Sequence, residues 1–442
     1  MIARVALGCI LVVAVTVGLR AGKPDVDEIL VILGWLALGV SLTLPARGVG
    51  AWLPTAVLAT TTALQLFRLR TFVGLPRFPP EDFAIVFASA RRLYRLGTDP
   101  YVDPRANSFP FPAYAMADAA GLWGRLDAAD AARVFLVVNA LALAGAVVAV
   151  VASARLTLGD ARPATTPLLV GALLAHPGTA QALLFGQTGV FVLFWTALGV
   201  WTWQRGAASW LPALAFTLAA MQKPYLVLVA AFFMAWWARD VVDQRAVSRE
   251  GRIGRAILVL GPLLLVALLV APGGVTLTTF RRFAGGLRRL HEIYSQSWGD
   301  NYSAVAIAVH AAEHVWSFDY GPAVQLASAL AVVSVLAAGV ITLPYASHRL
   351  FAALAWLAAS LLPFAIVYKH YYPWLVPVLF PALRLALERR IDASVALLVC
   401  GAVGLLQFLT APGFTLGVVA LIVACQLLAW RLRAPAPEAA RP

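Results

Sequence analysis

The chain has 442 residues, of which 61% are hydrophobic and 12% are charged, and its net charge is +13. A soluble domain is excluded because its surface would need about 25% charged residues. Long apolar runs also exclude a transmembrane β-barrel, whose strands alternate over about 10 residues. The composition therefore predicts an all-α, polytopic membrane protein with one transmembrane domain, residues 1–431.

The basic charge indicates nucleic acid only in a soluble chain, so we expect membrane lipids and no nucleic acid among the partners. In a membrane protein it is typical of basic loops beside anionic lipid, or of a site for a phosphorylated ligand. Cys9, Cys400 and Cys425 all lie inside apolar runs. This placement predicts buried thiols rather than disulfides or metal ligands.

Apolar runs recur along the whole chain. The first has one arginine and no convincing cleavage site before Lys23, so it is interpreted as an uncleaved span. Several runs are short or are broken by proline and glycine, and we expect roughly 11 to 14 transmembrane helices. The runs lie near residues 2–19, 29–44, 51–67, 133–153, 165–185, 188–203, 208–222, 224–238, 256–271, 321–342, 348–367, 371–387, 393–410 and 413–431.

Short basic loops predict the orientation, because arginine and lysine favour the cytoplasmic side. Counting spans puts the basic segments 239–255, 388–390 and 431–441 on one side, together with Arg155 and Arg205. Both termini then face the cytoplasm, and residues 432–442 are expected to be a disordered tail. The opposite, extracytoplasmic side of the plasma membrane receives three connections, which are residues 68–132, 272–320 and 368–374.

The first extracytoplasmic loop turns amphipathic after Pro79–Pro80. Its apolar residues recur at three- and four-residue spacing opposite three arginines, which predicts a helix lying in the membrane interface and ending at Gly97. Glu81 and Asp82 fall at its N-terminus, where the helix dipole is expected to lower the pKa of a carboxyl group. Asp82 could instead serve only as a helix cap. The apolar face comprises Phe83, Val86, Phe87, Ala90, Leu93 and Tyr94, and the arginines are Arg91, Arg92 and Arg95.

Two polar residues interrupt the following spans. Gln187 lies between glycines in "LLFGQTGVF", which indicates either a buried amide in need of partners or a simple bend. Lys223 lies between apolar runs in "AAMQKPYLVL". An ionisable residue near membrane depth is a functional candidate, although a lysine can also snorkel to the interface.

Two further groups lie on the later outer loops. Arg281, Arg282, Arg288 and Arg289 form a cluster in which guanidinium groups could bind phosphate, or could contact lipid headgroups. Lys369 and His370 lie among aromatic residues at the outer end of a span, and histidine titrates near neutral pH. The aromatic residues alone are typical of an interfacial belt.

On this topology one side of the membrane carries all five groups of polar residues, which are the first-loop carboxylates, Gln187, Lys223, the arginine cluster and the pair Lys369 and His370. This arrangement favours an enzyme that takes a phosphate-bearing lipid from the bilayer. A sugar on a polyprenyl phosphate already has a good leaving group, so the reaction needs a base and cations rather than a general acid. Asp82 is the candidate base. Arginines of the cluster, with Lys223, Lys369 and His370, are candidates for binding the donor. No obligatory metal is predicted, and no cofactor is expected.

The order of the motifs resembles glycosyltransferase family 87, the polyprenol-phosphate-sugar-dependent enzymes of GT-C architecture. The resemblance covers residues 75–385 and rests on "EDFAIVFASARRLYRLGTDPYVDP", "FPFPAYAMADAAGLWGRL", "FGQTGV", "QKPYLVL", "DNYS" and "KHYYPWLVP". It implies an inverting transfer of mannose to a phosphatidylinositol mannoside or lipomannan type of glycolipid. Asp82 matches the family's catalytic aspartate and His370 its late histidine. The motifs also place Gln187, Tyr101, Asn301 and Tyr302 along the site.

Other functions stay open at this point. The transferred sugar could be arabinose or glucose instead of mannose. A transporter or flippase of a lipid-linked sugar would also use broken helices and ionisable groups, although no internal repeat is visible here. A non-catalytic membrane scaffold would not need a carboxylate, a histidine and arginines on one face.

Overall fold

The computed structural model describes most of the N-terminal half and the C-terminal quarter of the chain. The described residues are 26–72, 78–102, 113–159, 165–205, 210–223, 252–254, 256–257, 260–261, 278–279, 281–286, 349–362, 369–407 and 411–432. The predicted spans at 2–19, 224–238 and 321–342, and most of 256–271, lie outside these ranges.

Regular structure within the described ranges is helical throughout, as the composition predicted. The N-terminal half contains α2 (Val26–Thr43), α3 (Val49–Phe72), α4 (Glu81–Ala90), the π-helical turn η1 (Arg91–Arg95), the 3-10 turn η2 (Pro100–Val102), α5 (Ala113–Ala120), α6 (Ala128–Leu158), α7 (Thr165–Leu174), α8 (Pro177–Leu184), α9 (Gly189–Gln204) and α10 (Trp210–Gln222). The C-terminal part contains α16 (Arg349–Ala359), the 3-10 turn η4 (Lys369–Leu375), α17 (Val376–Leu387), α18 (Ala393–Leu406) and α19 (Ala411–Arg431).

Several helices meet the length and apolarity needed to cross a bilayer. Among the described residues they are Val26–Thr43, Val49–Leu69, Ala128–Leu156 and Gly413–Arg431, and a fifth span forms there if α7 and α8 act together across a bend of 63°. A helix satisfies all its own interior backbone hydrogen bonds, which is why it can stand in hydrocarbon. The chain is therefore a polytopic helical membrane protein.

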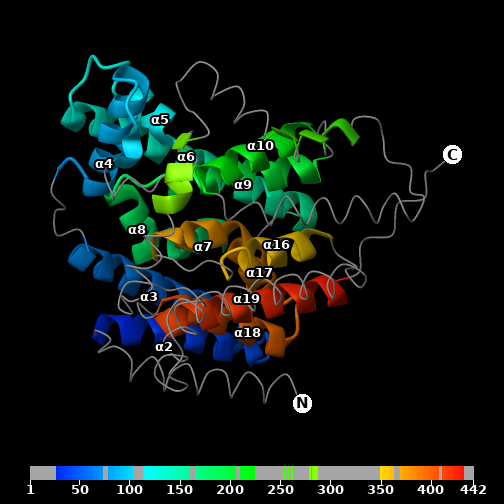
Figure 1. Cartoon of the computed structure of the whole chain (residues 1–442). Helices are drawn as coiled ribbons and strands as arrows, with labels where there is room; N and C mark the ends of the chain where they lie inside the picture. Colours follow the sequence, from blue (N-terminus) through cyan, green and yellow to red (C-terminus); the bar gives the residue numbers. More distant parts are fainter. Residues whose placement is uncertain are drawn as a thin grey trace, which may run out of the picture.

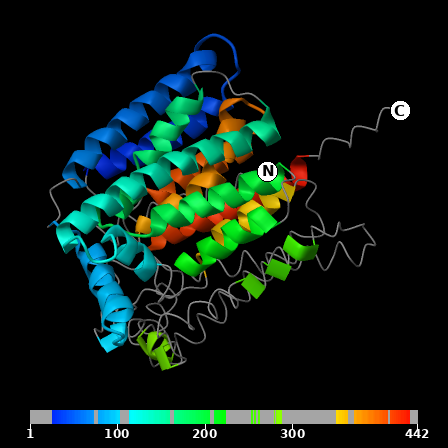
Figure 2. The same ribbon diagram turned by 90° about the horizontal axis from the view of Figure 1, so that it is seen from above.

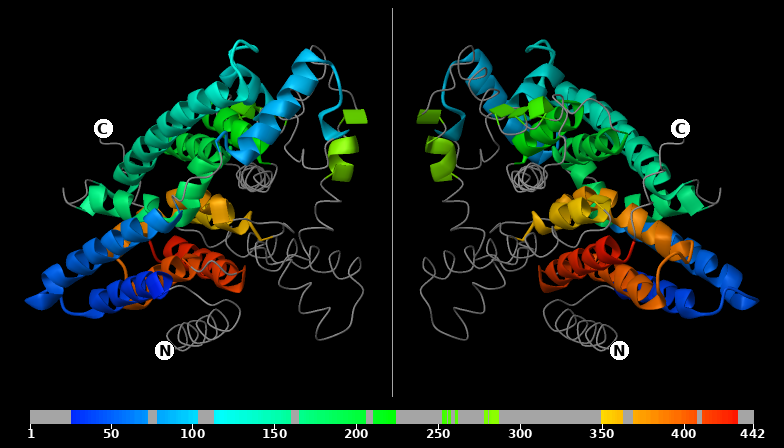
Figure 3. Two further views of the ribbon diagram at one scale, coloured as in Figure 1. Left: turned by 90° about the vertical axis from the view of Figure 1, so that its left-hand side faces the viewer. Right: turned by 90° about the vertical axis from the view of Figure 1, so that its right-hand side faces the viewer.

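The helices lie in layers, with one layer of α2, α3, α18 and α19 and another of α6, α9 and α10 (Figures 1 and 3). Between them run α7, α16 and α17. A large apolar cluster joins the layers, and Cys400 and Cys425 are fully buried in it, as the sequence predicted. Cys9 lies outside the described residues.

At one end of the bundle, arginine side chains form hydrogen bonds to the C-terminal ends of two helices, α2 and α6. Arg389 donates hydrogen bonds to the carbonyl oxygens of Leu42 and Leu44 after α2, and Arg390 donates to that of Leu158 at 2.5 Å. Arg384 donates to the Gly159 carbonyl oxygen at 2.5 Å. The ends of α2, α6 and α17 therefore lie together, which is the grouping that the basic loops predicted.

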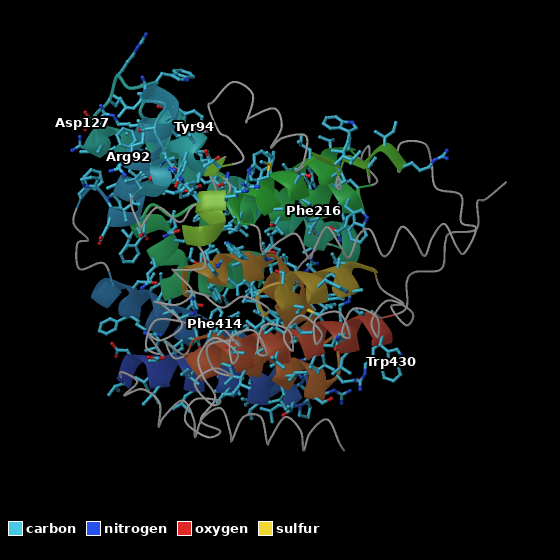
Figure 4. All side chains as sticks on the ribbon, viewed as in Figure 1. Arg92, Tyr94, Asp127, Phe216, Phe414 and Trp430 are labelled. Carbon is cyan, nitrogen blue, oxygen red and sulfur yellow. The ribbon has the colours of Figure 1, made fainter. Side chains whose placement is uncertain are left out.

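The helices α4 and α5 lie at the opposite end, set at an angle beside the longer helices (Figures 1 and 2). In Figure 4, Arg92, Tyr94 and Asp127 mark this end, and Trp430 marks the other. A second apolar cluster holds this end together, and it includes Phe83, Phe87 and Leu93. All three are at most 4% exposed, so these residues of the predicted apolar face pack against other segments of the chain. The predicted position of the helix in the membrane interface stays a prediction.

Candidate functional site

Asp82 lies in the first turn of α4, at the end of the bundle that carries α5. Its Oδ2 accepts a hydrogen bond of 2.5 Å from Nε2 of Gln187, which follows α8. The cap residue of α4 is Pro80, and the helix has no side-chain cap hydrogen bond. The observed partner of Asp82 is therefore a distant side chain rather than the start of its own helix. Glu81 is exposed, as expected for a solvated neighbour.

Lys223 completes the centre of this group, which we call the Asp82 cluster: Asp82, Gln187, Lys223 and Tyr371. The Lys223 Nζ lies 5.1 Å from the centroid of the Tyr371 ring, which is within range of a cation–π interaction. Its charge also acts on Asp82 across the cluster. Four segments meet here, namely α4, the connection after α8, the end of α10 and η4.

Burial dominates the electrostatics of the cluster. It raises the pKa of Asp82 above its ordinary value, and this effect exceeds the lowering by the Gln187 hydrogen bond and by the Lys223 charge. The expectation that the helix dipole would lower the Asp82 pKa is therefore wrong. Burial also lowers the pKa of Lys223 to about 8, against the opposing effect of Asp82. A carboxylate with a raised pKa is a stronger base than a solvated one.

Gly186 lets the connection after α8 approach α4. Its φ is +65°, a left-handed conformation that glycine adopts without strain. A Cβ at this position would lie 2.8 Å from Cβ of Phe83, the residue next to Asp82. The sequence "FGQTG" therefore combines a bend with a close contact, and that contact brings Gln187 to Asp82. Both earlier interpretations of Gln187, the bend and the partnered amide, apply together.

The aromatic segment η4 is buried, not part of a lipid-facing belt. Tyr371, Tyr372 and Trp374 are at most 3% exposed. Tyr371 stacks on Trp374 with ring centroids 4.5 Å apart, and the Trp374 indole N–H donates to the Gly189 carbonyl oxygen at 3.2 Å. The interpretation of these aromatics as an interfacial belt is wrong, because η4 packs against α8 and α9 inside the protein.

His176 supports the same segment from the bend between α7 and α8. Its ring stacks on Tyr372 at 3.5 Å, Nδ1 accepts a hydrogen bond from the Gly178 N–H, and Nε2 lies 3.0 Å from the Leu406 carbonyl oxygen. With Nδ1 accepting, Nε2 carries the proton and donates to that carbonyl. His176 was not among the predicted site residues, although a histidine before a proline inside an apolar run was a visible signal.

A second group of polar contacts joins the first loop to the helical stretch 281–286. Arg282 forms an ion pair with Asp99, whose other oxygen accepts a 2.8 Å hydrogen bond from the Tyr101 N–H. The rings of Tyr101 and Phe283 lie 5.6 Å apart. Tyr101 and Phe283 also belong to the apolar cluster that contains Phe83, so this contact continues into the support of α4.

The other predicted site residues are placed less completely. Arg281 is exposed on the stretch 281–286. The backbone of Lys369 and His370 begins η4, directly before Tyr371, but their side chains are outside the described part of the chain. Arg288, Arg289, Asn301 and Tyr302 also lie outside it. The structure therefore brings Asp82, Gln187 and Lys223 together and leaves these residues as predictions.

No known protein family, curated protein or solved structure matches this chain. The resemblance to glycosyltransferase family 87 therefore stays a prediction from motif order. Any function proposed for the chain has to explain the Asp82 cluster, in which a partly buried carboxylate lies with an amide and an ammonium group at one end of the helix bundle.

Proposed function

We propose that the chain is an inverting glycosyltransferase of GT-C type that moves mannose from polyprenyl-phosphate mannose to a glycolipid. The reaction would take place at the extracytoplasmic face of the plasma membrane, with Asp82 as the general base. The observation that carries the proposal is the hydrogen bond between Gln187 and a partly buried Asp82, beside Lys223. Such a carboxylate costs free energy to bury, and catalysis is a common reason for retaining one.

The chemistry follows from the groups in the cluster. The acceptor hydroxyl loses its proton to Asp82 as its oxygen bonds to the anomeric carbon. The bond from that carbon to the phosphate oxygen breaks, and polyprenyl phosphate leaves with the electron pair. Attack from the face opposite the leaving group inverts the anomeric centre, as in inverting glycosidases. Because the phosphate leaves as a stable anion, cations can replace a general acid.

Several cations would hold the donor phosphate. Lys223 is beside Asp82 already, and His370, Lys369 and the arginines of residues 281–289 are the further candidates. Arg282 has an alternative role, since it pairs with Asp99. Its side chain is 56% exposed, and an exposed ion pair contributes little stability, so a phosphate can compete for it.

A transporter of a lipid-linked sugar is the second candidate, and the bend between α7 and α8 favours it. The 63° break lies directly before the connection that carries Gln187. Discontinuous helices beside ionisable groups are typical of transporter binding sites. Against this candidate, the Asp82 cluster lies at one end of the bundle rather than midway along it (Figure 1).

Replacing Asp82 by Asn tests the transferase. Membranes that contain D82N are assayed for transfer of labelled mannose from polyprenyl-phosphate mannose to a lipid acceptor. Loss of a general base is expected to slow transfer by about 10²- to 10⁴-fold. The E81Q variant, which removes the exposed neighbouring carboxylate, should keep its activity. Full transfer by D82N would exclude Asp82 as the base.

The same vesicles separate the two functions. A transferase gives labelled glycolipid without moving the donor between leaflets, whereas a transporter moves the donor and forms no new glycosidic bond. Parallel donors that carry arabinose or glucose identify the sugar. Translocation without transfer by the wild-type chain would contradict the transferase and support the transporter.

A further inference from the structure

The two oxygens of Asp82 have different surroundings. Oδ2 accepts the 2.5 Å hydrogen bond from Gln187, and within the described residues Oδ1 has no hydrogen-bond donor. The charged groups that act on the carboxyl group are Lys223, from the end of α10, and Glu81, from the same helix. One oxygen is therefore fixed by an amide, while the described residues place no donor on the other.

The connection that carries Gln187 is held on both sides. The Gln187 N–H donates to the Ala182 carbonyl oxygen at 3.0 Å, which closes the end of α8. On the other side, Trp374 donates to the Gly189 carbonyl oxygen at the start of α9. Gly186 packs against Phe83 next to Asp82. These contacts fix the backbone from which the Gln187 side chain reaches the carboxylate.

We propose that Gln187 is a positioning residue for Asp82, which holds Oδ2 and leaves Oδ1 to receive the acceptor's proton. That Oδ1 receives the proton of the acceptor hydroxyl rests on the proposed function. The contact between Gln187 and Asp82 does not. An amide N–H can only donate, so its hydrogen bond favours the ionised form of the carboxyl group. Gln187 thereby opposes the effect of burial and keeps the base ready over a wider range of pH.

Two substitutions separate this role from simple packing. Q187E keeps the size of the side chain but replaces the donor by a second carboxyl group, so that two carboxyl groups share one site and one of them is held protonated. Q187L removes the donor without adding charge. Q181E is the matched control, because it makes the same change on α8 at a residue that has no contact with Asp82 among the described residues.

Carbodiimide labelling reads the protonation of Asp82 without any enzyme assay. The reagent adds to a protonated carboxylic acid and rearranges to a stable N-acylurea, which peptide mass spectrometry locates at Asp82. The full chain in its membrane is labelled over a range of pH, and D82N gives the background. For both Q187E and Q187L, the midpoint of Asp82 labelling is expected at higher pH than in the wild type and in Q181E.

The pH profile of mannose transfer provides the second readout. Loss of a hydrogen bond to a charged group predicts transfer about 10- to 100-fold slower than in the wild type at neutral pH. The difference from the wild type should narrow as rising pH ionises Asp82 in the variants. Unchanged labelling midpoints in both variants, or a loss of transfer that is equal at every pH, would overturn the assignment. If the wild type transfers no sugar, the proposed function fails, while the labelling midpoints still decide the role of Gln187.

Discussion

Replacing Gly186 by Ala tests the contact that brings the Gln187 connection to α4. At a φ of +65°, any residue with a Cβ is strained by about 1–2 kcal/mol. The new Cβ would also lie 2.8 Å from Cβ of Phe83. Carbon atoms pack best at about 3.5–4.0 Å, so one of the two segments must move. Overpacking of this kind costs about 1–3 kcal/mol, which gives a total of about 2–5 kcal/mol.

Gly97, which follows η1 in the first loop, offers a matched control. Its φ is +59°, and a Cβ there would meet no atom of the described residues within 4 Å. G97A therefore has the backbone strain without the clash, and we expect a cost of about 1–2 kcal/mol. The free energy of unfolding of both variants and the wild type is measured by denaturant titration in mild detergent, followed by tryptophan fluorescence.

The two variants should also differ in function. G186A moves Gln187 relative to Asp82, so mannose transfer is expected to fall further than the loss of folded protein explains. G97A should retain transfer in proportion to the protein that accumulates. Equal stability and equal activity of G186A and G97A would refute the close contact between the Gln187 connection and α4.

Two further predictions concern charges. In K223M, Asp82 loses a positive neighbour that favours its ionised form, so the Asp82 pKa is expected to rise. The acid limb of the pH profile of mannose transfer then moves to higher pH. An acid limb at the same pH as in the wild type would show that Lys223 does not act on the base. Arg68 and Glu28 form an ion pair of 3.2 Å with both side chains at most 5% exposed. R68M leaves the Glu28 charge buried without this cation and is expected to destabilise the protein by about 3–5 kcal/mol. The double variant R68M/E28Q should recover part of that loss in the same denaturant titration, and no recovery would contradict the ion pair.

The membrane class and the helix positions could be predicted from the sequence because both depend on local properties. Apolar runs such as 29–44 and 413–431 coincide closely with α2 and α19. The three- and four-residue spacing after Pro80 correctly placed Phe83, Phe87 and Leu93 on a buried face. A helix repeats every few residues, so its buried side can be read along the chain without knowing its neighbours.

The electrostatics of Asp82 could not be predicted in the same way. The helix dipole is a local property and suggested a lowered pKa, whereas burial among other segments raises it. Desolvation depends on every atom packed around the carboxyl group, and those atoms come from four parts of the chain. The position of Asp82 in its helix was therefore predictable, but its protonation was not.

The sequence by itself determined that this is a helical membrane protein and that Asp82, Gln187 and Lys223 are polar residues in need of partners. Only the tertiary structure decided which partners they have. Gln187 lies 105 residues from Asp82 and reaches it because Gly186 has no side chain to hold α4 away. Tyr371 faces Lys223, and Asp99 pairs with Arg282, through contacts between segments that are still more distant. Hydropathy and helical spacing describe each segment alone, whereas a site depends on which segments pack side by side.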